Sequence, residues 1–341
     1  MKLELIPRFQ WYRRLLRRFE SVFKRQDDTK ALLEAVRSEI AVLRQQHEVL
    51  MSEIQQRQDA LLAEMHRLHH ENHTLQSHAI EQALWTLRDR PFSSEVEKQS
   101  SEYQRLHRLH ALLHLRDVDG GTLIRTGRPH DGGYLMLDEF KPGMAAYSFG
   151  ICDDVSWDKS MAERGIECFM YDHTIEELPE EHELFHWSKE GICGDVPVEH
   201  CRTLADFITA NGHEERNDLI LKMDVEGAEW DAIAAASSET LSQFSQIVFE
   251  LHDVYSSALH ERICGFLSKL NETHQPVWVH GNNHADYARI DDVVVPWALE
   301  VLYVRRRDHQ FADSTHFYPL AQDMANNISR NDIRLGVWNV Q

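Results

Sequence analysis

The stretch Leu219-Ile220-Leu221-Lys222-Met223-Asp224-Val225-Glu226-Gly227-Ala228-Glu229-Trp230 changes its pattern within a few residues. A nearly continuous apolar run ends at Asp224, and a Gly-Ala pair then leads into residues that favour a helix. This pattern predicts a buried β-strand followed at once by a turn and a helix. Ligands of open α/β sheets bind at the carboxyl ends of the strands, so we expect Asp224 to face a cleft.

From about residue 119 onward, the chain alternates between short apolar runs and helical patterns. Such alternation is typical of a parallel sheet with helices on both faces. The predicted strands are residues 145–149, 167–171, 218–223, 246–251, 275–280 and 299–305. A helix is expected from Ser156, as its N-cap, to Arg164, and an earlier helix over residues 102–116.

The 341 residues carry a formal net charge of −20, which is divided unevenly along the chain. Residues 1–25 hold eight basic and two acidic residues, so the remainder has a formal charge of −26. An acidic body repels a phosphate backbone, which argues against a nucleic-acid partner. The five cysteines form no CxxC pair, no apolar run is as long as a membrane span, and the N-terminus lacks the features of a secretory signal. These features predict a reduced, cytoplasmic protein.

The first 90 residues have a different pattern. Residues 1–25 place apolar side chains at helical spacing with arginines between them, as in a basic helix that lies on an anionic membrane surface. Residues 26–90 repeat apolar positions in alternating steps of three and four, with one phase slip, which predicts a coiled coil and self-association. Packing of either helix on the globular domain is the alternative. Residues 91–118 are expected to connect the coiled coil to a domain over residues 119–341.

A glycine and a carboxylate follow the first two predicted strands. Gly150 comes directly after the first strand, and the absence of a side chain there lets a ligand approach the backbone. Asp172 follows the second strand, where an acidic residue can accept hydrogen bonds from two ribose hydroxyls. These two positions predict a nucleotide-like cofactor at the carboxyl ends of the strands.

Several motifs together resemble the FkbM family of methyltransferases that depend on S-adenosylmethionine (SAM). The run 222–230 is similar to the Lys-Ile-Asp-Val-Glu-Gly-Ala-Glu hallmark of that family, and the resemblance covers roughly residues 120–305. The other motifs are Asp131-Gly132-Gly133-Tyr134, Ser148-Phe149-Gly150-Ile151, Ser156-Trp157-Asp158 and Tyr171-Asp172. The resemblance implies a Rossmann-like SAM methyltransferase sheet, here preceded by an unrelated long α-helical coiled coil. It also implies that Asp131 and Ser156 contact the cofactor and that Asp195 contacts adenine.

Methylation of an oxygen requires the acceptor hydroxyl to lose its proton while it faces the methyl group. Asp224, Glu250 and His252, at the ends of the fourth and fifth predicted strands, are the candidate catalytic residues, with Asp224 or His252 as the base. Alternatively, Asp224, Glu250 and Asp253 offer the oxygen ligands that Mg²⁺ prefers, and the ion would lower the pKa of a bound hydroxyl. Purely structural hydrogen bonds are the third possibility.

The loop after the sixth predicted strand, His280-Gly281-Asn282-Asn283-His284, is rich in amides and imidazoles. A loop of this kind over a cleft suits a hydroxyl-rich acceptor that contacts His280, Asn282 and Asn283, although such residues are equally common in plain turns. Together with the N-terminal helix, it predicts O-methylation of a sugar or surface glycan, lipid-linked, at the cytoplasmic membrane face. The alternative is a catalytically degenerate SAM-fold scaffold whose coiled coil organises a glycan-assembly complex.

Overall fold

The computed structural model describes residues 99–290 and 293–339. All of them fall in the second of two units into which the chain divides, residues 79–341. The predicted basic helix (1–25) and coiled coil (26–90) lie outside the described residues. Within the described part of the chain, no helix combines the length and the hydrophobicity needed to span a membrane.

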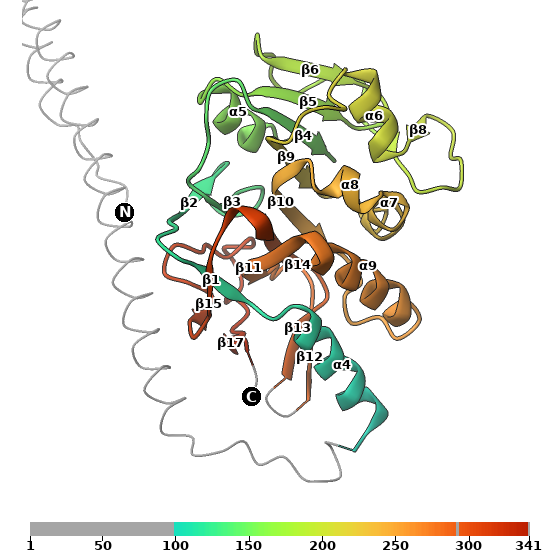
Figure 1. Ribbon diagram of the computed structural model, residues 1–341. Coiled ribbons are helices and arrows are strands. Elements are labelled where there is room, and N and C mark those ends of the chain that lie inside the picture. The colour runs from blue at the N-terminus through green and yellow to red at the C-terminus, as the bar shows by residue number, and fades with distance from the viewer. Residues whose placement is uncertain (1–98, 291–292, 340–341) are drawn as a thin grey trace, which may run out of the picture. The chain divides into compact units, whose positions relative to one another are not determined.

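A seven-stranded sheet, in which most neighbours run parallel, lies at the centre of the described unit (Figure 1). In spatial order its strands are β11 (His274–Gly281), β14 (Leu299–Arg305), β10 (Phe244–Leu251), β9 (Leu219–Met223), β4 (Ala145–Phe149), β5 (Glu167–Tyr171) and β6 (Phe185–Ser188). The strands from β10 to β6 are parallel to one another, whereas β14 is antiparallel to both of its neighbours. The predicted α/β fold with a mainly parallel sheet is therefore confirmed.

Helices and short strand pairs surround this sheet. The helices are α4 (Ser101–Leu112), α5 (Ser156–Ala162), α6 (Leu204–Ala210), α7 (Glu229–Ala235), α8 (Ser238–Leu241), α9 (His260–Thr273) and the 3₁₀ turn η1 (Arg306–Asp308). The strand pairs are β1 (Arg116–Val118) with β15 (Phe311–Asp313), β2 (Leu123–Thr126) with β3 (Tyr134–Leu137), β7 (Gly191–Ile192) with β8 (Cys201–Arg202), β12 (Tyr287–Ile290) with β13 (Val293–Pro296), and β16 (Phe317–Tyr318) with β17 (Gly336–Val337). Figure 1 shows α5 on one side of the sheet and α6, α7 and α9 on the other.

The register of the parallel strands brings their carboxyl ends to one level. Phe149, the last residue of β4, is paired with Tyr171 at the end of β5 and with Met223 at the end of β9. Met223 is in turn paired with Phe249 of β10. The next residue of each strand must therefore lie along one edge of the sheet. These residues are Gly150, Asp172, Asp224 and Glu250.

The helix predicted over residues 102–116 is shorter and belongs to the same hydrophobic core as the sheet. Its observed form, α4, ends at Leu112 and packs against α9 and β13. The helix does not continue beyond Leu112 because the following backbone groups bind the C-terminal part of the chain. Asn339 pairs with the backbone of Leu115, and the Trp338 indole donates to the Leu113 carbonyl. Sequence periodicity cannot show such partners, since they lie more than 200 residues away.

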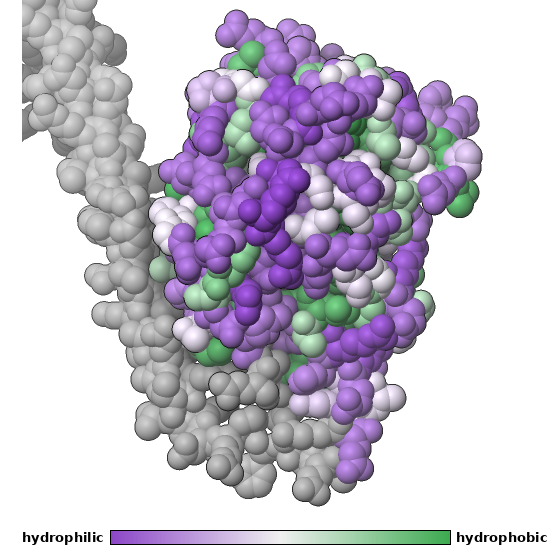
Figure 2. Space-filling model, in the orientation of Figure 1, coloured by the Kyte–Doolittle hydropathy of each residue, from purple (hydrophilic) through white to green (hydrophobic). Residues whose placement is uncertain are grey.

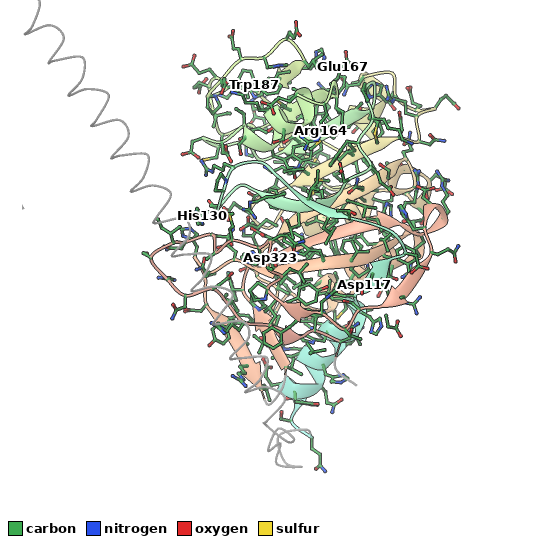
Figure 3. The ribbon with its side chains drawn as sticks, turned by 90° about the vertical axis from the view of Figure 1, so that its left-hand side faces the viewer. Asp117, His130, Arg164, Glu167, Trp187 and Asp323 are labelled. Atoms are coloured by element: carbon green, nitrogen blue, oxygen red, sulfur yellow. The ribbon has the colours of Figure 1, made fainter. Side chains whose placement is uncertain are left out.

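The C-terminal segment, residues 314–339, packs closely against the sheet. Trp338 is buried and stacks on His110 of α4 at a centroid distance of 4.0 Å. Asp323 accepts a hydrogen bond from the Trp278 indole of β11, and Figure 3 shows Asp323 over the face of the sheet turned toward the viewer. The sequence predicted no structure beyond Arg307, so this segment is a finding of the tertiary structure alone.

The face of the described residues that Figure 2 shows is mainly hydrophilic. Among the described residues, the large hydrophobic side chains that are exposed include Val196 and Val198 in the loop between β7 and β8. A few exposed apolar residues of this kind are normal on a protein surface.

Candidate active site

A cavity of about 720 Å³ opens at the carboxyl edge of the sheet. One end lies over β4 and β5 and the other over β10, β14 and β11, with β9 between them. Its lining includes Arg128, Asp131, Tyr134, Gly150, Cys152, Asp153, Asp154, Asp172, Thr174, Gly191, Lys222, Asp224, Glu226, Glu250, His252, Asn282, His284 and Trp297. Cavities of roughly 300–1,000 Å³ are usual for small-molecule sites.

At the β4–β5 end, the carboxylate of Asp172 holds the loop that follows β4. One of its oxygens accepts from the amides of Ile151 and Cys152, both at 2.9 Å. The other accepts from the amide and the hydroxyl of Thr174, at 2.8 and 2.6 Å. Burial opposes ionisation of Asp172, but these hydrogen bonds outweigh it and hold its pKa below the usual value. The carboxylate therefore stays charged and shapes this end of the cavity, whereas its contact with a ribose stays a prediction.

Gly150 lines the cavity, and a contact within the protein also demands a glycine there. A Cβ at this position would lie 1.6 Å from the backbone carbonyl oxygen of Asp224, and the residue has a φ of +81°. The carbonyl of Gly150 accepts a hydrogen bond from the ammonium of Lys222. The loops after β4 and β9 thus touch each other directly, and this contact gives the glycine a structural role besides the predicted one.

Ser156 is not the N-cap of α5 and does not line the cavity. The helix begins at Ser156 with Val155 as its cap, and Asp154 accepts from both the amide and the hydroxyl of Ser156. The hydroxyl of Ser156 also accepts from the amide of Arg128. Asp154, rather than Ser156, provides the capping hydrogen bond at the start of this helix, because its side chain accepts from the amide of Ser156. Asp131, by contrast, does line the cavity.

Asp195 lies outside the cavity and is exposed. Gly191 and Ile192 reach the cavity wall, but the chain then turns into the surface loop between β7 and β8. Gly194 is packed so tightly against α7 that a Cβ there would lie 2.7 Å from the carbonyl oxygen of Asp231. The chain has therefore left the cavity before Asp195, and the predicted adenine contact does not fit this geometry.

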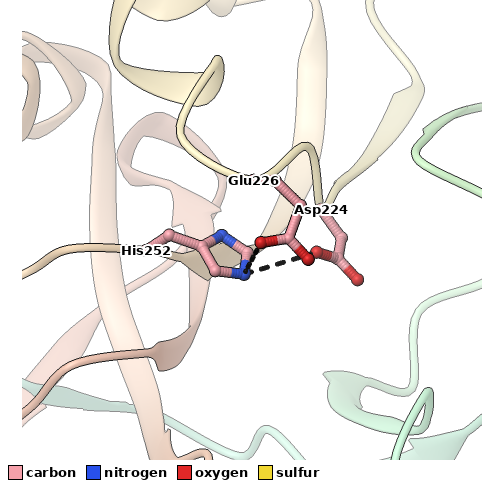
Figure 4. Close-up of side chains that lie close together, drawn as sticks. All are labelled: Asp224, Glu226 and His252. Carbon is pink, nitrogen blue, oxygen red and sulfur yellow. Dashed lines mark ion pairs between the residues drawn. The ribbon is translucent and has the colours of Figure 1, made fainter. Parts of the chain in front are cut away.

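Beside β9 and β10, several carboxylates surround the imidazole of His252. Its Nε2 lies 3.5 Å from Glu226, 3.7 Å from Glu250 and 3.8 Å from Asp224, and its Nδ1 lies 3.4 Å from Glu229. Figure 4 shows the side chains of Asp224 and Glu226 turned toward the ring. The sequence predicted that Asp224, Glu250 and His252 would come together, and the structure places all three in one cluster.

The cluster shifts the pKa values of its members upward. Burial alone would lower the pKa of His252, but Glu229, Glu250 and Asp224 outweigh it and raise the value to about 9. Burial raises the pKa of Asp224, and this effect exceeds the opposing charges of Lys222 and His252. Burial and the charge of Asp224 raise the pKa of Glu250 well above its usual value. The raised pKa favours the protonated form of His252, whereas a base must be neutral, and the role of His252 as the base stays a prediction.

Glu229, the last acidic residue of the run 222–230, connects the backbone on the two sides of this cluster. It is fully buried, and its two oxygens accept from the amides of His252 at 2.9 Å and Gly227 at 2.8 Å. Gly227 has a φ of +100°, a conformation that L side chains rarely adopt. The turn after β9 is thus tied to the end of β10 through one carboxylate.

The metal ligands predicted from the sequence differ from the donors that the structure brings together. Asp224, Glu226 and His252 offer ligand atoms that all lie within 4.8 Å of one another. Asp253 does not line the cavity, because the chain turns at this residue: its φ is +56° and its carbonyl accepts from the amide of Ser256. Glu250 borders the cluster, but its carboxylate accepts from Asn282 at 2.6 Å.

Two of the three residues predicted to bind an acceptor hold the C-terminal segment instead. His280 is buried between Glu300, at 2.9 Å, and Asp332, at 3.2 Å. Asn283 donates to carbonyls of residues 327, 330 and 331 and accepts from the amide of Asn327. Only Asn282 lines the cavity. His280 and Asn283 are therefore used to bind residues 327–332 of the C-terminal segment.

Four lining or supporting residues were not assigned from the sequence. Glu226 and Glu229 lie in the run 222–230, so their spacing from Asp224 was an available signal. His284 is the last residue of the predicted polar loop and is exposed at the cavity. Trp297, half-buried in the same wall, contacts Tyr255 edge-on at 4.8 Å, and no sequence pattern marks it.

The fold and the cavity together define the class of protein: a Rossmann-like α/β domain with its ligand site at the carboxyl edge of a mainly parallel sheet. Residues 170–273 match the family described as the Methyltransferase FkbM domain. This match, which includes Asp172, the run 222–230, Glu250 and His252, supports a methyltransferase-like domain in this part of the chain.

Other comparisons add little. A solved structure described as "Putative hemolysin from Streptococcus thermophilus" is similar at 10% sequence identity, over 51% of this chain and 71% of that one, with a TM-score of 0.28. Among curated proteins, none matches this chain.

Proposed function

We propose that this protein is a SAM-dependent O-methyltransferase that binds its cofactor over β4 and β5 and its acceptor over β10, β14 and β11. The observation that carries the proposal is the single cavity that joins the Asp172 loop to the cluster of Asp224 and His252. The FkbM domain match over residues 170–273 supports the reaction class.

The lining at the β4–β5 end fits the chemical groups of SAM. The loop of Gly150 to Asp154 and the turn of Asp172 to Thr174 present backbone and polar side chains for a ribose and an amino-acid chain. Asp224 and Glu226 place negative charge beside the middle of the cavity, where a sulfonium cation would be attracted. SAM, when bound, supplies an activated methyl group, so the protein needs to contribute mainly orientation and a base.

Asp224 is the residue that we expect to accept the proton of the acceptor hydroxyl. Its raised pKa makes its carboxylate a stronger base than an exposed aspartate. The protonated ring of His252, 3.8 Å away, would stabilise the negative charge that develops on the acceptor oxygen. The raised pKa of Glu250 favours its neutral form, and its carboxyl oxygen keeps Asn282 in place by accepting a 2.6 Å hydrogen bond from the amide.

The acceptor end suits a hydroxyl-rich ring. Trp297 offers an aromatic face and His284 a polar side chain in the same wall of the cavity. A sugar ring presents both hydroxyls and an apolar face, and each has a counterpart there. We propose a sugar or surface glycan, lipid-linked, as the acceptor class.

Cofactor binding is tested by calorimetric titration of the full chain with SAM and with its demethylated product, S-adenosylhomocysteine. Asp172→Asn should weaken both by at least about tenfold, which is about 1.4 kcal/mol. The matched control is Asp195→Asn, which removes the same charge from an exposed position outside the cavity and should leave both affinities unchanged. Absence of binding by the folded wild-type chain would overturn the proposal.

The catalytic assignment is tested by transfer of radiolabelled methyl groups from SAM to a glycolipid extract. Asp224→Asn should lower turnover by about 10²–10⁴-fold, the usual contribution of a general base. Cofactor affinity, measured by the same titration, separates a loss of binding from a loss of chemistry. Full turnover in this variant would remove Asp224 from the mechanism.

For the N-terminal region we propose peripheral attachment to the inner membrane surface through residues 1–25 and self-association through residues 26–90. The support is the basic amphipathic pattern of the first segment and the heptad-like pattern of the second. Deletion of residues 1–25 should abolish sedimentation with anionic liposomes but leave the oligomer intact. Unchanged sedimentation would contradict the attachment.

One observation favours a second function. Asp172 already accepts four hydrogen bonds within the protein, which leaves little capacity for a ribose. In that case the domain is a catalytically degenerate scaffold whose coiled coil organises a glycan-assembly complex. The titration with SAM decides between the two functions, because only the enzyme requires binding.

A further inference from the structure

Three side chains from two neighbouring strand ends converge at the middle of the cavity. His252 Nε2 lies 3.8 Å from a carboxylate oxygen of Asp224 and 3.5 Å from one of Glu226 (Figure 4). Ligand atoms about 2.0–2.2 Å from one metal ion lie about 3–4 Å from each other. The observed separations therefore leave room for an ion among the three groups with small side-chain movements.

The side of His252 that faces away from the cluster lies beside a carboxylate, although its Nδ1 makes no hydrogen bond there. Its Nδ1 lies 3.4 Å from Glu229, which is fully buried and also accepts from the backbone amide of His252. Histidines that bind metal usually direct their other ring nitrogen to a carboxylate or a carbonyl, which sets the ring orientation. Glu229 is independent of the three ligands and occupies the position of such a partner.

The cluster is also open on the side of the cavity. The side chain of Glu226 is 85% exposed and that of Asp224 is 29% exposed. Lys222, the nearest lysine on the same strand, donates to the carbonyl of Gly150. A metal ion binds only the neutral imidazole, so an ion bound here would take the place of any proton on Nε2 of His252.

We propose that Asp224, Glu226 and His252 bind one divalent transition-metal ion in the cavity. The imidazole nitrogen in this set favours ions such as Mn²⁺, Fe²⁺ or Zn²⁺ over Mg²⁺, which prefers oxygen ligands only. The donor set thus replaces the predicted Asp224, Glu250 and Asp253 and changes the class of ion. With an ion bound, Asp224 and His252 would be its ligands rather than the base and the protonated ring, and the ion itself would lower the pKa of an acceptor hydroxyl. That role rests on the proposed function, whereas binding of the ion does not.

The proposal is tested with the full chain after treatment with a chelator, by titration with Mn²⁺. Electron paramagnetic resonance measures free Mn²⁺ and calorimetry measures its affinity. We expect one ion per chain and weaker binding of Mg²⁺ at the same site. Glu226→Gln, which changes an exposed side chain and so preserves the fold, should weaken Mn²⁺ binding by at least about tenfold, and His252→Asn should do the same.

The matched control is Asp153→Asn, which removes the same charge from an exposed residue of the same cavity wall that is not among the three ligands. Its Mn²⁺ affinity should stay within about twofold of wild type, since no ligand is lost. Equal weakening by Asp153→Asn and Glu226→Gln would show diffuse attraction and overturn the proposal, as would absence of Mn²⁺ binding by the folded chain. Binding of Mg²⁺ as tight as that of Mn²⁺ would overturn the assigned ion class. Titration with SAM in the chelator tests the proposed function separately, so the two can fail independently.

Discussion

Asp172 and Asp224 follow the two strands that flank β4, at the same level of the sheet, but their surroundings are opposite. Asp172 accepts four hydrogen bonds, and its pKa is lowered. Asp224 is partly buried and lies beside Glu226 and Glu229, and these effects raise its pKa. The carboxylate of Asp172 stabilises the loop that shapes the cavity, whereas the surroundings of Asp224 disfavour its charged form. Strain of this kind is expected where a protein performs chemistry.

Among the substitutions considered, replacement of Asp172, whose carboxylate accepts four hydrogen bonds, should lower the free energy of unfolding most. Asp172→Ala removes an acceptor that hydrogen-bonds three amides and a hydroxyl, and a hydrogen bond to a charged group contributes about 1.5–3 kcal/mol. Because such contributions are not additive, we expect a loss of about 3 kcal/mol in the free energy of unfolding. Urea denaturation at pH 7 measures it. A loss below about 1 kcal/mol would mean that Asp172 does not hold the loop.

His274 provides a third case, in which burial should make the stability of the protein depend on pH in the acid range. His274 is fully buried, and burial lowers its pKa to about 4, below the ordinary 6.5. The unfolded chain then binds more protons between these two values, so the folded state loses stability as the pH falls from 6.5 to 4. For this one group the slope is about 1.4 kcal/mol per pH unit.

The measurement is the free energy of unfolding across this pH range, for wild type and for His274→Gln. The variant lacks the titrating ring, so its stability should fall less steeply with decreasing pH, even if it is lower at pH 7. Parallel curves for the two proteins would contradict the assignment of His274 as a buried neutral histidine.

Replacement of Asp224, which lies among other carboxylates, should change the free energy of unfolding least. Asp224→Asn removes a negative charge from a buried, like-charged neighbourhood, so in the presence of a chelator the free energy of unfolding at pH 7 should stay equal or rise by up to about 1 kcal/mol. Urea denaturation beside wild type checks this. A loss larger than about 1 kcal/mol would place Asp224 with Asp172, as a structural residue, and would break the contrast between the two ends of the cavity.

Several strands could be predicted from the sequence to the residue. Residues 145–149, 167–171 and 299–305 are the observed β4, β5 and β14. Central strands are buried on both faces, so they are continuous apolar runs, and in β4 and β5 a glycine or an aspartate marks the carboxyl end. The same signal placed Gly150, Asp172, Asp224 and Glu250 along one edge of the sheet.

Four predicted site residues that do not line the cavity have one feature in common. Asp195, His280, Asn283 and Asp253 were predicted from the loops that follow strands, and a loop can turn toward a ligand or toward the protein. His280 and Asn283 found partners in the C-terminal segment, which lies about 50 residues further along the chain. A polar residue with a distant partner looks the same in the sequence as one with a ligand.

The sequence by itself determined the α/β class, the strands of the sheet and the position of Asp224, because local hydrophobic patterns encode burial. It also carries the predictions for residues 1–90, which concern patterns outside the described residues. Only the tertiary structure decided that Glu226 and Glu229 join His252, that Trp297 enters the cavity wall, and that residues 314–339 occupy the polar groups of β11. These outcomes depend on contacts between segments far apart in the chain, where packing and hydrogen-bond geometry, rather than local pattern, select the partners.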